Sequence, residues 1–213
     1  LKLSRLVYRD ATRKSTVHLK AFERHANNYV DDTEVQIQRR AVGGWELGVD
    51  HKEFVGDATL DANLAYKRGT RDFDATDAPE ESTGQGTARF GLWAADVSLT
   101  LPFKWLGQSW RYQPSVRLQG NDTPLTPQDR FSIGGRYSVR GFDGEGSFSG
   151  DAGWLLRQDL GWVLGNSGHE LYVGIDAGGV SGQSTETLVG KTLSGAVIGL
   201  RGKIAHKMQE AKR

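Results

Sequence analysis

The chain of 213 residues contains no cysteine, which excludes disulfide bonds, thiolate metal sites and a cysteine nucleophile. Charge of neither sign predominates: 27 Lys and Arg residues balance 26 Asp and Glu residues, so nothing indicates a nucleic-acid partner. No apolar run approaches the roughly 18 residues that a transmembrane helix needs. The sequence therefore indicates a fold made of short elements without covalent cross-links.

Signals for enzymatic chemistry are also missing. The sequence has no Gly-x-Ser-x-Gly elbow and no phosphate-binding loop. The acidic loop 72–81 lacks an EF-hand pattern, so a solvated loop is the better interpretation. The histidines do not have metal-ligand spacing; they are His18, His25, His51, His169 and His206. We therefore expect a non-enzymatic protein without a catalytic residue, a cofactor or a metal site.

Glycine and aromatic residues point to an all-β protein. The 28 glycines amount to about 13% of the chain, near twice the usual share. Proline is sparse, and short runs alternate apolar with polar residues. In the run 169–180, for example, Leu171, Val173 and Ile175 alternate with polar residues or glycine. Ten strands are predicted in this way, at 1–9, 15–23, 33–40, 43–54, 57–68, 87–101, 109–119, 152–164, 169–180 and 193–204.

The connections between these strands favour a membrane barrel. Residues 69–86 and 120–151 form long polar connections, whereas 54–57 and 165–168 are short. Long loops at one end and short turns at the other are typical of outer-membrane barrels. Charges of both signs on the polar faces suit a hydrated lumen. They also suit the solvated surface of a soluble β-sandwich, which remains the alternative fold.

Tryptophan positions fit the same barrel. Trp154 and Trp162 share a face eight residues apart, about 26 Å along a strand at ~3.3 Å per residue. A tilt of about 40° reduces this to roughly 20 Å, close to the ~25 Å apolar band between aromatic girdles. Trp45, Trp105 and Trp110 also fall near predicted strand ends, whereas Trp93 does not. We expect Trp45, Trp110, Trp154 and Trp162 to lie at the membrane interfaces, against outer-membrane lipid.

One segment stands out within the loop 120–151. Residues 134–145 read Gly-Gly-Arg-Tyr-Ser-Val-Arg-Gly-Phe-Asp-Gly-Glu. Arg140 lies between Val139 and Gly141 at what the pattern suggests is the tip of a hairpin. A long cation is costly there unless it has a fixed partner.

This segment resembles the Omp85 superfamily and, within it, the TpsB transporters of two-partner secretion. The hallmark of the family is Val-Arg-Gly-Tyr/Phe, here Val139, Arg140, Gly141 and Phe142. A second family motif, Gly/Phe-x-Asp-x-Gly, matches Gly174, Asp176 and Gly178. The resemblance is strongest from about 87 to 204.

The resemblance implies a sixteen-stranded, monomeric transmembrane antiparallel β-barrel in the outer membrane of a Gram-negative bacterium. The tetrapeptide would lie on loop 120–151, which folds into the lumen between strands eleven and twelve. Residues 1–204 would then supply strands five to fourteen, and 205–213 a polar tail. The chain lacks an initiator Met, a signal peptide, the periplasmic POTRA domains, the plug helix and the remaining strands. We therefore expect a partial barrel.

Strand alternation suggests a partner for Arg140. Asp176 falls on the face opposite Val173 and Ile175, and Gly174 and Gly178 flank it, which leaves room for a loop backbone. Arg140 could form a charge-assisted pair with Asp176, and the resemblance implies the same pair. Asp159, on the adjacent strand, is a rival partner, and a solvent-exposed Arg140 is the third possibility.

The function implied by the resemblance is a pore that exports a partner exoprotein, a TpsA-like adhesin, haemolysin or toxin. Export would proceed without nucleotide hydrolysis. A barrel insertase of the same superfamily is one alternative, and a soluble β-sandwich binding module is another.

Overall fold

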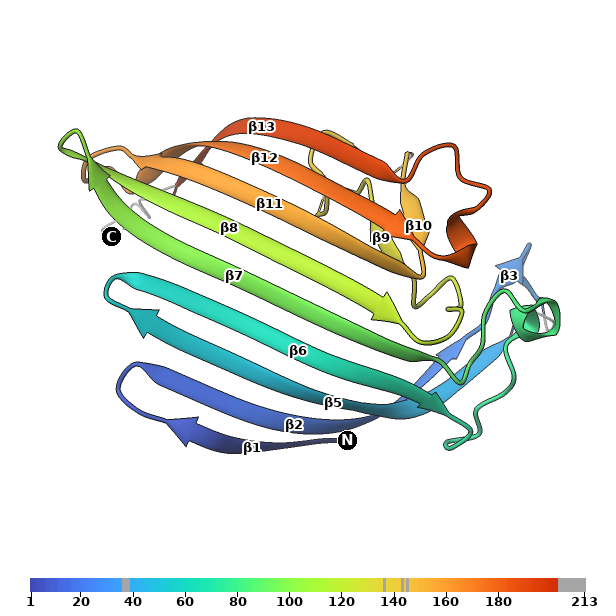
Figure 1. The fold of residues 1–213 in the computed structure, drawn as a ribbon. Helices are drawn as coiled ribbons and strands as arrows, with labels where there is room; N and C mark the ends of the chain where they lie inside the picture. Colours follow the sequence, from blue (N-terminus) through green and yellow to red (C-terminus); the bar gives the residue numbers. More distant parts are fainter. Residues whose placement is uncertain (36–38, 136, 143, 145, 203–213) are drawn as a thin grey trace, which may run out of the picture.

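A computed structural model describes residues 1–35, 39–135, 137–142, 144 and 146–202. Nine strands form one antiparallel sheet in the order β1-β2-β5-β6-β7-β8-β11-β12-β13 (Figure 1). They are β1 Lys2–Arg9, β2 Arg13–Ala26, β5 Arg40–Val55, β6 Ala58–Thr70, β7 Gly91–Trp105, β8 Gln108–Asn121, β11 Ala152–Val163, β12 His169–Ser181 and β13 Thr192–Gly202.

Smaller elements lie in the connections. The hairpins β3–β4 and β9–β10 each form a separate two-stranded sheet. Their bounds are Tyr29–Val30, Thr33–Glu34, Phe131–Ile133 and Phe148–Gly150, and two 3₁₀ helices span Pro79–Thr83 (η2) and Gln183–Thr185 (η3).

Turn length differs between the two ends of the sheet, as the sequence predicts. The short turns gather at one end and the long connections at the other (Figure 1). In the β7–β8 turn, Leu106 and Gly107 both have positive φ, 50° and 73°. Such a two-residue turn matches the twist of the strands it joins. The short turns therefore fix the register from strand to strand, and the long connections carry the irregular structure.

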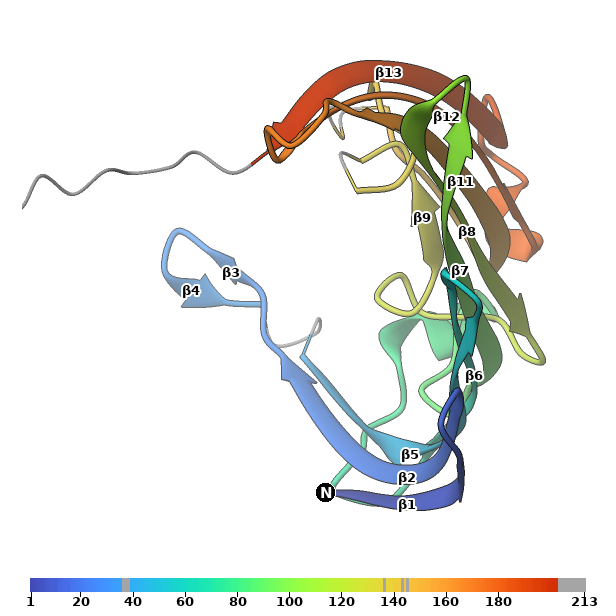
Figure 2. The same cartoon turned by 90° about the vertical axis from the view of Figure 1, so that its left-hand side faces the viewer.

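The sheet curves strongly and has distinct convex and concave sides (Figure 2). Along β12, Val173 and Ile175 are 50% and 65% exposed, whereas the next residue, Asp176, is fully buried. Among the described residues no second sheet packs on this apolar side, so the β-sandwich alternative is wrong. The predicted all-β antiparallel barrel fold is confirmed.

The buried apolar residues form two clusters beneath the long connections. One joins Val42, Phe90 and Leu92 to Leu125, with Ala78 and Ala88. The other joins Phe131, Ile133 and Val139 to Leu155 and Val180. The core therefore lies between the connections and the sheet, and it holds the described residues of the 122–151 segment along the inner side of the curve (Figure 2).

Three sequence predictions need correction. The strand predicted at 33–40 is wrong: Thr33–Glu34 pairs with Tyr29–Val30 instead, through a turn in which Asp31 and Asp32 have φ of 45° and 62°. Residues 36–38 lie outside the described residues, as does the predicted tail 205–213.

Counting back from β8 as strand eleven, β1 becomes strand six. Trp93 does lie near a strand end, because β7 begins at Gly91 and not at residue 87.

Candidate functional site

The candidate site is built on the β9–β10 hairpin, in which Phe131 pairs with Gly150 and Ile133 with Phe148. Between the two short strands, the Ser138 hydroxyl accepts hydrogen bonds from the backbone amides of Gly134 (2.9 Å) and Gly135 (3.0 Å) and donates to the carbonyl of Gly135. This hydroxyl closes a tight turn immediately before Val139 and Arg140.

Apolar contacts seat the hairpin on the sheet. Phe131, Ile133 and Val139 are each at most 1% exposed and pack against Leu155 and Val180. The partly buried Phe142 and Phe148 pack against the same cluster. Full burial of side chains of this size stabilises by about 1.5–3 kcal/mol each, so the position of the segment does not depend on Arg140 alone.

Glycines on the strands clear the space that the hairpin occupies. A Cβ atom added to Gly195 would overlap the carbonyl oxygen of Arg140, and one on Gly174 would lie 2.5 Å from Nη2 of Arg140. A Cβ on Gly178 would lie 3.1 Å from Ile133. Sequence analysis identified Gly174 and Gly178 but missed Gly195, whose only signal is its register position opposite Asp176 on β13.

Arg140 contacts both carboxylates that sequence analysis treated as alternatives. Its Nε and backbone N–H donate to Oδ2 of Asp176 over 2.6 and 2.9 Å, and Nη2 donates to Oδ1 over 2.6 Å. Nη2 also donates to Oδ1 of Asp159 over 2.6 Å. The side chain is 14% exposed. Hydrogen bonding to Asp176 raises the pKa of Arg140 above its usual range, so the guanidinium keeps its charge at every physiological pH.

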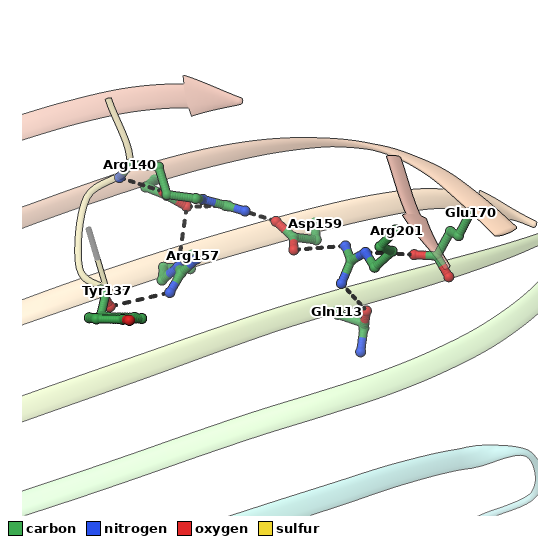
Figure 3. A network of polar contacts seen from close by, with 8 residues as sticks. Gln113, Tyr137, Arg140, Arg157, Asp159, Glu170 and Arg201 are labelled. Atoms are coloured by element: carbon green, nitrogen blue, oxygen red, sulfur yellow. Dashed lines mark hydrogen bonds and ion pairs between the residues drawn. The ribbon is translucent and has the colours of Figure 1, made fainter. Parts of the chain in front are cut away.

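Further charges extend the pair along the concave wall (Figure 3). Arg157 on β11 lies 3.6 Å from Asp176 and donates to the carbonyl of Tyr137 over 3.2 Å. Arg201 on β13 contacts Asp159 over 3.0 Å and Glu170 over 3.3 Å. The network continues to two residues on β8, Gln113 and Arg111. Arginines and acids alternate, so no described carboxylate of the network lacks a cation.

A second charged cluster holds the base of the same segment. Asp129, 8% exposed, accepts two hydrogen bonds from Arg24 on β2, over 3.2 and 2.6 Å. Lys67 on β6 lies 3.7 Å from Asp129 and 4.7 Å from the ring centroid of Phe22. Sequence analysis gave Asp129 no role, and because Arg24 is 105 residues away no local pattern reveals the contact.

Aromatic side chains on the convex side form two groups. Near the short turns, the rings of Trp105 and Trp162 lie 5.6 and 6.2 Å from that of Trp110. Near the long connections, Tyr66 lies 5.7 Å from Trp45 and 4.5 Å from Trp93. Trp154 pairs with Leu118 and Gly179, close to the same end as the second group.

The concave side carries a hollow of about 650 Å³ lined by charges of both signs, including Lys52, Asp61, Asp96, Arg117 and Arg157. In the described part of the chain, no group of His, Asp and Glu side chains could hold a metal ion. Over the same residues, no helix is long and apolar enough to cross a membrane.

The curved sheet, its apolar convex side and its charged concave side define the class as a transmembrane β-barrel. Residues 1–202 match the family model of the haemolysin secretion/activation proteins ShlB/FhaC/HecB. The chain therefore belongs to this family, the TpsB transporters of the Omp85 superfamily. It is an outer-membrane protein of a Gram-negative bacterium.

Individual relatives agree with the family match. The chain is 30% identical over 203 residues to the outer membrane transporter CdiB-2 of Burkholderia pseudomallei, covering 95% of this chain and 35% of the relative. It is 29% identical over 206 residues to CdiB of Dickeya dadantii, covering 94% and 36%. The solved structure of CdiB from Acinetobacter baumannii superposes with a TM-score of 0.83 at 34% identity, covering 96% and 35%. The chain thus spans about a third of the length of these relatives.

Proposed function

We propose that this chain forms part of the wall of a two-partner secretion pore that carries a TpsA-like exoprotein, an adhesin, haemolysin or toxin, across the outer membrane. The contact of Arg140 with both Asp176 and Asp159 supports this proposal most directly. It ties the 134–147 segment to the concave wall, which would be the lumen of a closed barrel, so the segment lies where it can obstruct or guide a passing chain.

Transport in this proposal needs no nucleotide. The sequence has no phosphate-binding loop, and folding of the client outside the cell would make its passage irreversible. A mixed-charge wall such as that of the hollow attracts neither acidic nor basic clients strongly, which suits the passage of an unfolded chain of mixed composition.

The proposed membrane contact follows from the convex side. The two aromatic groups would lie at the two membrane interfaces, with Trp110 and Trp162 at one and Trp45 and Trp154 at the other, against outer-membrane lipid. Closure of the sheet removes free strand edges, so one copy of the intact protein would suffice as a monomeric barrel.

The test is export by the Arg140→Ala variant of the intact protein. We expect its barrel to assemble, as judged by heat-modifiable migration in detergent, because the apolar cluster still seats the hairpin. Secretion of the client should fall at least tenfold. Lys52→Ala is the matched control, since Lys52 pairs with Asp61 on the same side without touching the hairpin. Normal export by Arg140→Ala would overturn the proposal.

A further inference from the structure

Each carboxylate that holds Arg140 also contacts an arginine of the wall (Figure 3). Nε of Arg157 lies 3.6 Å from Oδ1 of Asp176, and Nη2 of Arg201 lies 3.0 Å from Oδ2 of Asp159. These arginines belong to β11 and β13, not to the connecting segment. They therefore stay beside the two carboxylates if the hairpin tip leaves the wall.

While Arg140 is bound to the wall, the two wall arginines make different contacts. Arg201 already donates a hydrogen bond to Asp159, so that carboxylate remains paired without Arg140. Arg157 stands opposite Asp176 in the β11–β12 register but lies beyond hydrogen-bonding distance. Its one hydrogen bond described here goes to the carbonyl of Tyr137, on the segment itself. Departure of the segment would remove that bond and leave the guanidinium free to approach Asp176.

The burial of Asp176 makes this replacement necessary. The residue is fully buried, and a buried carboxylate that loses its only cation is strongly destabilised. Without a second arginine, release of Arg140 would be opposed by this unpaired charge. With Arg157 in reach, one charge-assisted pair is exchanged for another.

We propose that Arg157 is the replacement partner of Asp176, a positioning residue that lets the 134–147 segment detach from the wall during export. The proposal rests on the proposed function, since it assumes that the segment must move. It predicts that removing Arg157 holds the segment more firmly in place, whereas removing Arg140 loosens it. If Arg157 only supported the wall and held the carbonyl of Tyr137, its removal would loosen the segment.

Segment release can be followed with a cysteine at Ser138. Ser138 is 8% exposed and the chain has no cysteine, so Ser138→Cys places a single buried thiol in this chain. Because a thiol hydrogen-bonds more weakly than the hydroxyl that closes the turn, rates are compared only among variants that all carry Ser138→Cys. A water-soluble maleimide should modify it only when the segment detaches. In the intact protein carrying Ser138→Cys, we expect Arg140→Ala to accelerate modification about tenfold and Arg157→Ala to slow it about tenfold. Lys52→Ala should leave the rate unchanged.

Two further variants make the test decisive. Arg157→Lys keeps a cation near Asp176 and should restore a rate within threefold of the parent. The double variant Arg140→Ala, Arg157→Ala leaves Asp176 without either cation, so its barrel should lose heat-modifiable migration at a lower temperature than both single variants. Modification of Arg157→Ala at the parent rate or faster would overturn the proposal. Such a result would leave the proposed function intact if Arg140→Ala still abolished export, because that experiment does not depend on Arg157.

Discussion

At the residue scale, the position of Arg140 depends on glycines that leave room for it as much as on charge. Gly174 and Gly195 lie on neighbouring strands and face the same side as Asp176, and a Cβ atom at either position would meet Arg140. Several aromatic side chains also cover glycines across the sheet, as Phe131 covers Gly153 and Tyr172 covers Gly199. On the strands, glycine makes room for tightly packed neighbours. In the hairpin, Gly134 and Gly141 have φ of 101° and 98°, a backbone conformation that favours glycine.

Gly195→Ala is therefore expected to unseat Arg140. The added methyl group would overlap the Arg140 carbonyl, which belongs to the backbone and cannot rotate away. Overpacking of this kind costs about 1–3 kcal/mol. Maleimide modification of a cysteine at 138 should become at least fivefold faster.

Gly120→Ala is the matched control, because nothing lies within 4 Å of a Cβ atom at that strand position. An unchanged modification rate in Gly195→Ala would show that the close approach of Arg140 to β13 does not hold the segment.

The sequence predicts part of this site through strand alternation. Once Val173 and Ile175 are assigned to the lipid side, Asp176 must face the other way, and Asp159 follows from the neighbouring strand. Alternation could not show that Arg140 contacts both carboxylates, because that depends on the register between β11 and β12. Nor could it reveal the role of Gly195, because that role depends on a contact with the backbone of Arg140, 55 positions earlier in the chain.

At the element scale, the 122–151 segment is attached to the sheet at two separate places. At its tip, Arg140 binds Asp159 on β11 and Asp176 on β12. At its base, Asp129 binds Arg24 on β2 and lies near Lys67 on β6. The strands of the base contact, β2 and β6, precede β8 in the sheet order, whereas the strands of the tip contact follow it, so the tip can leave the wall while the base stays attached. The structure therefore favours motion of the tip over motion of the whole segment.

Asp129→Asn is expected to lower barrel stability more than a typical charge removal. It leaves Arg24 and Lys67 near a neutral amide, and Lys67 is 24% exposed. Loss of a charge-assisted hydrogen bond in such a setting costs about 1.5–3 kcal/mol. The temperature at which heat-modifiable migration is lost should fall by several degrees.

Asp96→Asn serves as the comparison, since Asp96 is 59% exposed and lies 4.0 Å from Arg117. Exposed pairs contribute about 0–1 kcal/mol, so little change is expected there. Equal effects of the two substitutions would contradict a special role for the base contact.

Strands are predicted correctly from the sequence where one face of the strand is apolar and the other is polar. Strands such as β8 and β12 have an apolar and a polar face over most of their length, and their bounds follow within a few residues. The prediction failed at 33–40, where Val35 and Ile37 imitate alternation but Asp31 and Asp32 place a turn just before them. Strands of two or three residues, such as β3 and β9, are too short to display a period.

At the scale of the whole molecule, a barrel of this sheet would place lipid on the convex side and water on the concave side. Ile175 is 65% exposed near the middle of β12 and lies between the two aromatic groups along the strand. An arginine facing lipid at that depth costs about 2–4 kcal/mol. Ile175→Arg should therefore reduce the folded, heat-modifiable fraction sharply.

The opposite face provides the control for this substitution. Ser98 lines the concave hollow, where water accommodates a new charge, so Ser98→Arg should assemble normally. Tolerance of arginine at 175 together with rejection at 98 would reverse the assignment of the two faces.

Whether Arg140 and Asp176 together anchor the segment is tested by a double-mutant cycle between them in the intact protein. Four proteins carrying Ser138→Cys are compared for their rate of maleimide modification: the parent, Arg140→Ala, Asp176→Ala and the double variant. Because the two side chains share their hydrogen bonds, the effects should be strongly non-additive, with a coupling of about 1–3 kcal/mol. Effects that add within about 0.5 kcal/mol would show that Arg140 and Asp176 act independently, and the anchored segment would have to be abandoned.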